Sequence, residues 1–129
     1  MIVRHSDDLR GTEREVETDE FISRRLILAR DGMGFSFHET IIKAGTDMFI
    51  CYANHVESVY CIAGRGEIAV VDGATYPIEP GVLYALDGHE QHHLRAWEEL
   101  RLMCVFNPAL TGREVHDAHG TYPPPEQTG

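Results

Sequence analysis

The sequence is poor in three features that each point to a particular class of protein. It has three cysteines, an odd number with no C-x-x-C pair, which indicates neither a disulfide framework nor a zinc knuckle. It has no apolar run near the ~18 residues that a membrane-spanning helix needs, and polar residues follow Met1 where a signal peptide is hydrophobic. We therefore expect a cytoplasmic protein with reduced thiols and no membrane partner.

Positive charge is the third scarce feature. The chain has 11 Lys and Arg residues against 21 Asp and Glu residues, a formal net charge of -10. A surface of this sign repels phosphate backbones, so we expect no nucleic-acid partner and favour a small molecule. With 129 residues, the chain is long enough for one domain with a real core and too short for two ordinary ones.

Turn-forming pairs such as Asp31-Gly32, Asp72-Gly73 and Asp87-Gly88 recur along the chain and separate short apolar stretches. Short strands at this spacing are typical of an antiparallel barrel or sandwich. We expect strands near residues 24–30, 34–43, 47–52, 57–63, 67–71, 75–79, 82–86, 91–96 and 100–106, and one short helical turn within 7–12.

Alternation along two of these strands predicts which side chains point inward. In the segment RLMCVFN, one face is apolar and is expected to face the interior: Leu102, Cys104 and Phe106. In the segment GFSFHET, alternation separates a polar face from an aromatic one: Ser36, His38 and Thr40 against Phe35 and Phe37. Two arrangements remain open here. Either the polar face lines a cavity, or it faces water while the phenylalanines enter the core.

The spacing between Gly45 and Gly64 matches the first motif of many cupins, which are small double-stranded barrels. In that motif a glycine is followed after five residues by His-x-His, after three more by Glu and after six more by Gly. Here every spacing fits, but Cys51 and Ala53 occupy the two histidine positions, and only Glu57 is retained. The predicted fold is therefore all-β: a cupin-type antiparallel double-stranded β-barrel (jelly roll) with an altered site.

The second cupin motif ends in a glycine followed after two residues by a histidine, and here that position is Tyr84. A metal held by Glu57 and Tyr84 needs a third ligand. On the strand QHHLRA, His92 shares a face with two apolar residues and is expected to point inward, whereas His93 alternates outward. His89, which follows an Asp-Gly turn, is expected to be solvated.

One nitrogen and two oxygen ligands suit ferrous iron or manganese, with zinc possible, and they leave positions open for water or substrate. The alternative is that Glu57, Tyr84 and His92 simply hydrogen-bond one another inside the barrel.

Four segments of the chain together resemble ectoine synthase, a cupin-fold family: GMGFSFHET, NHVESVYCIAGRGE, YPIEPGVLYALDGHEQHHLRA and RLMCVFNPALTGREVHD. The resemblance implies a metal-dependent hydro-lyase that cyclises N-γ-acetyl-L-2,4-diaminobutyrate to the compatible solute L-ectoine with loss of water. It also implies a cytoplasmic homodimer, with a catalytic metal, Fe(II) first, held by Glu57, Tyr84 and His92. We expect one cupin domain over residues 1–117 and a flexible tail over 118–129.

Carried over by motif, the resemblance places substrate contacts on seven residues: Arg25, Thr40, Tyr52, Cys104, Phe106, Glu114 and His116. Three of them suit proton transfer and are the candidate catalytic acids and bases: Tyr52, Glu114 and His116. The guanidinium of Arg25 can fork onto a carboxylate, whereas Arg24 alternates outward and is expected to be a surface charge. Cys104 is interpreted as a cavity-lining thiol rather than a nucleophile.

Departures from the family pattern occur at Phe21, where the family usually shows tryptophan, and at His38, where some members have asparagine. Two other functions also remain open. A non-catalytic cupin that binds a metal or small ligand has no need of the retained polar set. Other cupin enzymes, such as small isomerases or oxygenases, typically keep the His-x-His that this chain lacks.

Overall fold

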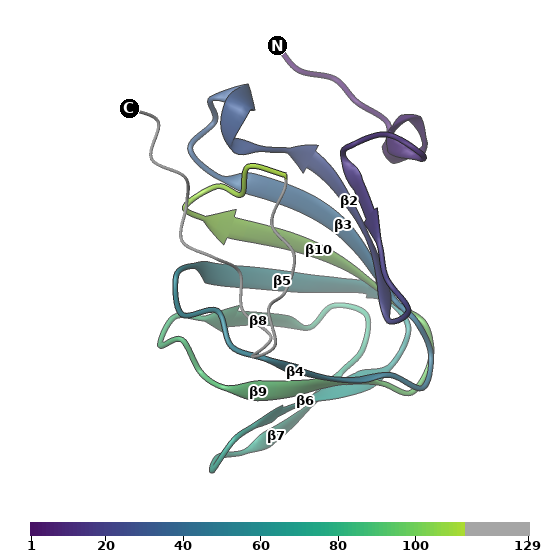
Figure 1. The fold of residues 1–129 in the computed structure, drawn as a ribbon. Helices are drawn as coiled ribbons and strands as arrows, with labels where there is room; N and C mark the ends of the chain where they lie inside the picture. The colour runs from purple at the N-terminus through teal and green to yellow at the C-terminus, as the bar shows by residue number, and fades with distance from the viewer. Residues whose placement is uncertain (113–129) are drawn as a thin grey trace.

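The computed structural model describes residues 1–112, which form two facing antiparallel sheets (Figure 1). The larger sheet has the order β1-β2-β3-β10-β5-β8 and consists of β1 (Glu15–Glu17), β2 (Phe21–Ile27), β3 (Ser36–Ile42), β10 (Leu100–Asn107), β5 (Val56–Ala63) and β8 (Leu83–Leu86). The smaller sheet has the order β4-β9-β6-β7 and consists of β4 (Asp47–Ile50), β9 (His92–Ala96), β6 (Gly66–Val70) and β7 (Thr75–Ile78). This is the antiparallel double-stranded barrel of the cupins, as predicted.

All the predicted strands are present, with shifted ends. The strand expected over residues 24–30 is β2, which begins earlier, at Phe21, and ends at Ile27. The helical turn expected within residues 7–12 is the 3-10 helix η1 (Ser6–Leu9), and a second one, η2 (Ala29–Asp31), follows β2. The domain boundary expected at residue 117 and the tail expected over 118–129 lie outside the described residues.

The short strand β1 was not predicted, and it makes the expectation for Arg24 wrong. Glu15 on β1 and Glu39 on β3 lie opposite Arg24 in the two neighbouring ladders. The carboxylates of Glu15 and Glu39 form ion pairs with the guanidinium of Arg24, at N–O distances of 2.9 and 3.2 Å. Arg24 is therefore buried on the outer face of the sheet rather than exposed. A three-residue strand of sequence EVE has too little apolar alternation to be recognised.

The cupin spacing has a steric basis at its glycines. Gly64 has a φ of +92°, and a Cβ at this position would collide with the backbone carbonyl of Glu99. Gly81 has a φ of +98°, which is also in the left-handed region that favours glycine. Gly64 follows the end of β5 and Gly81 precedes β8, and at both positions another side chain would be strained, so these glycines fix the ends of two strands that carry site residues.

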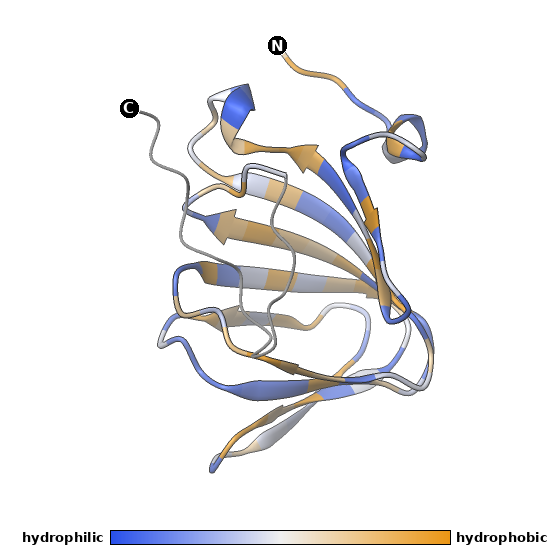
Figure 2. Ribbon diagram, in the orientation of Figure 1, coloured by the Kyte–Doolittle hydropathy of each residue, from blue (hydrophilic) through white to orange (hydrophobic). Residues whose placement is uncertain are grey.

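The alternation along β3 and β10 is confirmed. Leu102, Cys104 and Phe106 are all buried, and β10 is mostly hydrophobic along its length, whereas β3 carries hydrophilic bands (Figure 2). On β3, Ser36 and His38 are also buried and face the interior, while Phe35 and Phe37 are only half-buried. The polar face of β3 thus lies inside the barrel, which decides between the two arrangements that the sequence leaves open.

The N-terminal segment is fixed to the sheet through Asp31 in η2. Its two carboxylate oxygens accept paired hydrogen bonds from Arg4 at 3.1 Å and from Arg14 at 3.0 and 3.1 Å. The backbone N–H of Leu28 donates to the same carboxylate at 2.9 Å. Burial alone would raise the pKa of Asp31, but these donors together lower it well below its ordinary value.

Candidate active site

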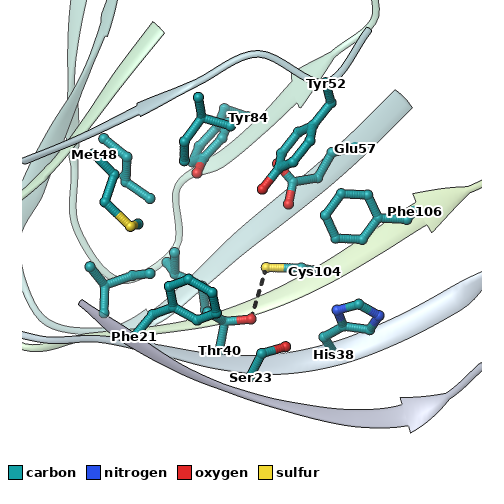
Figure 3. Close-up of a pocket in the computed structure, with 14 residues that line it drawn as sticks. Phe21, Ser23, His38, Thr40, Met48, Tyr52, Glu57, Tyr84, Cys104 and Phe106 are labelled. Atoms are coloured by element: carbon teal, nitrogen blue, oxygen red, sulfur yellow. Dashed lines mark hydrogen bonds between the residues drawn. The ribbon is translucent and has the colours of Figure 1, made fainter. Parts of the chain in front are cut away.

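A pocket lies between the two sheets (Figure 3). Six of the residues predicted for the site line it: Thr40, Tyr52, Glu57, Tyr84, Cys104 and Phe106. They come from β3, β5, β8, β10 and the loop after β4. Residues far apart in the sequence therefore share one cavity.

Strand register brings four of these side chains together. Glu57 on β5 lies opposite Phe106 on β10. Two residues further along β5, Val59 lies opposite Cys104 on β10 and opposite Tyr84 on β8. Because alternate residues of a strand share a face, all of these side chains project from the larger sheet toward the smaller one. The site is built mainly on paired strands, which hold their side chains more rigidly than loops do.

The opposite end of the pocket wall is polar and comes from β2 and β3. Ser23 pairs with Thr40, and Arg25 pairs with His38. Arg25 is fully buried, and it donates from Nε to Ser23 Oγ at 3.3 Å and from Nη1 to the Gly112 carbonyl at 3.1 Å. Within residues 1–112, the residues that line the pocket include Ser23 and His38 but not Arg25. Arg25 thus places a buried positive charge next to the pocket wall.

His38 is a neutral imidazole in this wall. It is buried, and its ring lies 5.2 Å from that of Phe106. Burial and the neighbouring charge of Arg25 lower the pKa of His38 well below its ordinary value. Among the described residues, its Nε2 has no hydrogen-bond partner. A neutral nitrogen of this kind is available to a polar group of a bound molecule.

Cys104 is a protonated thiol in the pocket. Burial raises its pKa well above the ordinary value, and the neighbouring carboxyl of Glu57 raises it further. The thiol donates to Thr40 Oγ1 at 3.6 Å (Figure 3). Since a nucleophilic cysteine needs a thiolate, this environment fits a cavity-lining thiol.

Solvent is largely excluded from the ionisable groups of Glu57 and Tyr84. Burial raises the pKa of Glu57 to about 8. Burial also raises the pKa of Tyr84 well above its ordinary value, with a further contribution from Glu57. The carboxyl group of Glu57 and the phenol oxygens of Tyr52 and Tyr84 point toward the same space in the pocket (Figure 3). A positive ion in that space would stabilise the charged forms that burial disfavours.

His92 is the inward histidine of β9, as the alternation predicts. It is fully buried, and its Nδ1 lies 2.9 Å from the carbonyl oxygen of Glu90. Because a carbonyl only accepts, Nδ1 carries the proton and Nε2 keeps its lone pair. This Nε2 is buried and has no hydrogen-bond partner among the described residues. His93 lies on the outer face and pairs with Asp47 Oδ1 at 2.8 Å.

The donor set of Glu57, Tyr84 and His92 fits a divalent metal ion. It offers a buried carboxylate oxygen, the phenol oxygen of a partly buried tyrosine, and one imidazole nitrogen whose tautomer is already the one that binds metal. Within residues 1–112, no three His, Cys, Asp or Glu side chains are grouped as a metal site. The candidate set contains only two residues of these four types, Glu57 and His92, and its third donor is the tyrosine Tyr84. His92 itself is not among the pocket-lining residues, although its ladder partner Ile50 is.

Several pocket residues were missed or only half recognised from the sequence. Ser23 was missed because the strand was expected to begin at residue 24, although alternation backward from Arg25 would have found it. Phe21, noted only as a departure from the family pattern, and His38, noted as a departure and as part of the polar face of residues 34–43, both line the pocket. Glu114 and His116 lie outside the described residues.

Comparison with known proteins gives a consistent result. The family described as Ectoine synthase matches residues 1–126 of the chain. The L-ectoine synthase of Desulfatibacillum aliphaticivorans is 59% identical over 126 residues, which are 95% of this chain and 97% of that protein. The crystal structure of ectoine synthase from P. lautus has a TM-score of 0.89 and 58% identity, and the match covers 100% of this chain and 95% of that one.

More distant structures share the fold alone. The EutQ protein of Clostridium difficile has a TM-score of 0.61 and 20% identity, and the match covers 83% of this chain and 75% of that one. In residues 1–112 there is no helix with the length and apolar character needed to cross a membrane.

Proposed function

This chain belongs to the ectoine synthase family, and we propose that it closes the ring of N-γ-acetyl-L-2,4-diaminobutyrate to give L-ectoine and water. The observation that carries the proposal is the pocket, in which Thr40, Tyr52, Glu57, Tyr84 and Cys104 surround one space. A non-catalytic binding module has no need of this combination. Identity of 59% to an L-ectoine synthase over nearly the whole chain supports the enzyme over both alternatives.

The reaction joins the substrate's α-amine nitrogen to the carbon of its acetyl amide. A C–N bond forms, the amide oxygen takes up protons and leaves as water, and a C=N bond completes the six-membered ring. Uncatalysed attack is slow because an amide is a poor electrophile and the open chain rarely curls. The apolar walls formed by Phe106, Met48 and Leu102 hold the chain in a curled shape and exclude water from it.

The polar end of the pocket suits the substrate carboxylate. Arg25 supplies the buried positive charge there, and Ser23, His38 and Thr40 supply hydrogen-bonding groups between it and the pocket. A carboxylate bound at this end directs the rest of the substrate toward Glu57 and Tyr84 at the other end. We therefore assign substrate orientation to Arg25 and Thr40.

Proton transfer requires a base for the attacking amine and an acid for the leaving oxygen. Tyr52 is buried, lines the pocket and packs edge-on against Phe106 with 5.1 Å between ring centroids. Its phenol is directed into the space beside Glu57 (Figure 3). We assign acid–base roles to Tyr52 together with Glu114 and His116, and substrate contacts to Cys104 and Phe106.

Glu57, Tyr84 and His92 would hold the metal, for which we propose Fe(II) ahead of Zn or Mn. When bound, such an ion supplies Lewis-acid polarisation of the amide oxygen. The chain's own contribution is the orientation of the three donors. Glu90 fixes the His92 tautomer, and the β5–β8 ladder fixes Glu57 and Tyr84 on one face.

We also propose that the protein works as a cytoplasmic homodimer. In the described chain, β8 ends the larger sheet and β7 ends the smaller one, so each has an edge without a neighbouring strand. Unpaired edges are commonly covered in an assembly, and a two-fold dimer is the simplest way to cover them.

The experiment that tests the proposed function compares two tyrosines. Tyr52→Phe removes the pocket phenol, and we expect it to lower turnover by about 10² or more. Tyr76→Phe removes a phenol that is 55% exposed outside this pocket, and it should leave turnover unchanged. By the same assay, Glu114→Ala and His116→Ala should each lower turnover by about 10² to 10⁴ while metal content is retained. Wild-type turnover in Tyr52→Phe, Glu114→Ala and His116→Ala alike would contradict these assignments.

A further inference from the structure

We propose that His89 is a positioning residue that holds Tyr52 and His92 in a fixed relation at the mouth of the barrel. It lies in the β8–β9 connection, residues 87–91, between the candidate ligands Tyr84 and His92. The sequence predicts only a solvated histidine at this position. Its ring is indeed exposed, but one ring nitrogen is engaged. The inference rests on the proposed function for the roles of Tyr52 and His92.

The first contact is from the ring of His89 to the backbone of Tyr52. Nδ1 of His89 lies 2.7 Å from the Tyr52 carbonyl oxygen. Since that oxygen only accepts, Nδ1 carries the proton and donates. A second contact runs the other way, from the Cys51 thiol to the carbonyl oxygen of His89 at 3.6 Å. These two contacts run in opposite directions between the loop after β4 and the β8–β9 connection. Together they fix the distance between these loops and their relative orientation.

The backbone of His89 is held in an uncommon conformation. Its φ is +56°, in the left-handed region that residues other than glycine rarely adopt. The turn is closed by the Gly88 N–H, which donates to Glu90 Oε1 at 3.0 Å. A non-glycine residue persists in this conformation where its surroundings hold it there, and such positions concentrate at functional sites.

The next residue carries the restraint to the metal-ligand candidate. The carbonyl oxygen of Glu90 accepts from His92 Nδ1 at 2.9 Å, which fixes the His92 ring and its tautomer. Thus His89 donates to the backbone of Tyr52, while the carbonyl of the adjacent Glu90 accepts from His92. If the His89 contact is lost, the Glu90 carbonyl is free to shift, and the geometry of Tyr52 relative to His92 is no longer defined.

His89 does not line the pocket, so it acts through Tyr52 and His92 and is not a catalytic residue. The loss of a group that orients a metal ligand commonly lowers metal affinity or activity by about tenfold to a hundredfold. We expect an effect of that size on kcat with little change in KM, because the carboxylate end of the pocket is untouched.

The test uses two substitutions at one position and a control on the next strand. His89→Gly removes the ring but readily adopts the left-handed backbone, so the fold is kept. His89→Asn also tolerates this backbone and supplies an amide N–H in place of the ring donor. His93→Ala removes a histidine on the outer face, where it pairs with Asp47. For each full-length protein, kcat, KM, melting temperature and Co²⁺ affinity by visible absorption are measured.

We expect His89→Gly to lose about tenfold or more in kcat and to bind Co²⁺ more weakly, with an unchanged melting temperature. His89→Asn should recover most of both losses, and His93→Ala should match the wild type. Wild-type kcat and Co²⁺ affinity in His89→Gly would overturn the proposal, as would equal losses in the Gly and Asn variants. If the wild type forms no ectoine, the proposed function fails, but the Co²⁺ affinities still decide the role of His89.

Discussion

The thiol of Cys104 donates to the hydroxyl of Thr40 across the β3–β10 ladder, with 3.6 Å between sulfur and oxygen. Leu102, not Cys104, is the direct ladder partner of Thr40, so this is a diagonal contact within one inner face. The contact gives the sulfur a fixed place in the pocket wall without making it a nucleophile.

Cys104→Ser is therefore expected to keep ectoine formation within about tenfold of the wild type, because a hydroxyl can still donate to Thr40. Steady-state kinetics at saturating metal is the measurement, with Cys61→Ser, a buried thiol outside the pocket lining, as the comparison. Complete loss of turnover in Cys104→Ser alone, together with a covalent adduct on Cys104 in mass spectra of the wild type during turnover, would contradict a cavity-lining role.

Metal binding is expected to depend on Glu57, Tyr84 and His92 together. Glu57→Ala, Tyr84→Phe and His92→Ala each remove one donor, and two remaining protein ligands hold a metal poorly. Metal content after dialysis, measured by plasma emission, should fall strongly in all three. His93→Ala is the matched control, since its ring lies on the outer face of the same strand. Full metal content in His92→Ala together with loss of metal in His93→Ala would show that His93, and not His92, is the ligand from β9.

Asp31→Asn is expected to destabilise the fold without touching the pocket. The carboxylate pairs with Arg4 and Arg14, and breaking a buried ion pair on one side costs about 3 kcal/mol. The pKa of Asp31 is lowered in the folded state. Its carboxylate therefore stabilises the fold at pH values above the ordinary pKa of 3.8, and this stabilisation is lost as the pH falls below 3.8. The free energy of urea unfolding at about pH 7 and about pH 3 measures both effects.

The control for this substitution is Glu79→Gln, which breaks an exposed ion pair with Arg65. Such pairs contribute less than about 1 kcal/mol. The difference in unfolding free energy between Asp31→Asn and the wild type should shrink toward about pH 3, because the Asp31 carboxyl of the unfolded wild-type chain becomes protonated there and the unfolded state is stabilised. If Asp31→Asn were as stable as Glu79→Gln at neutral pH, the claim that the Asp31 carboxylate fixes the N-terminal segment would be contradicted.

Most of the fold, and the choice of Glu57, Tyr84 and His92 as candidate ligands, followed from local patterns, whereas the substrate contacts were carried over from the family resemblance. The spacing of Gly45, Gly64 and Gly81 reflects backbone conformations, so it predicts loops and strand starts directly. Alternation sorted His92 from His93 because the two faces of β9 differ in apolar content. These features depend only on neighbours in the sequence.

Features that depend on distant segments were not predictable. Arg24 is buried because Glu15 on the adjoining strand β1 pairs with it, as Glu39 does from β3, and the three-residue strand β1 carries no recognisable pattern. Arg25 is not among the pocket-lining residues, whereas its ladder partner His38 and its hydrogen-bond partner Ser23 are. The contact from His89 to Tyr52 joins residues 37 positions apart through a backbone carbonyl, a group present in every residue. No sequence motif marks such a bond.

The most direct test of the central claim is a proton NMR time course of Fe²⁺-loaded protein with N-γ-acetyl-L-2,4-diaminobutyrate. Ring closure predicts that the acetyl methyl resonance is replaced by the ring methyl of ectoine, with equal loss of substrate and gain of product and with no free acetate. The same time course with Glu57→Ala should show a flat substrate signal. Release of acetate and diaminobutyrate would identify a hydrolase, and an unchanged substrate with wild-type, metal-loaded protein would contradict the proposed reaction.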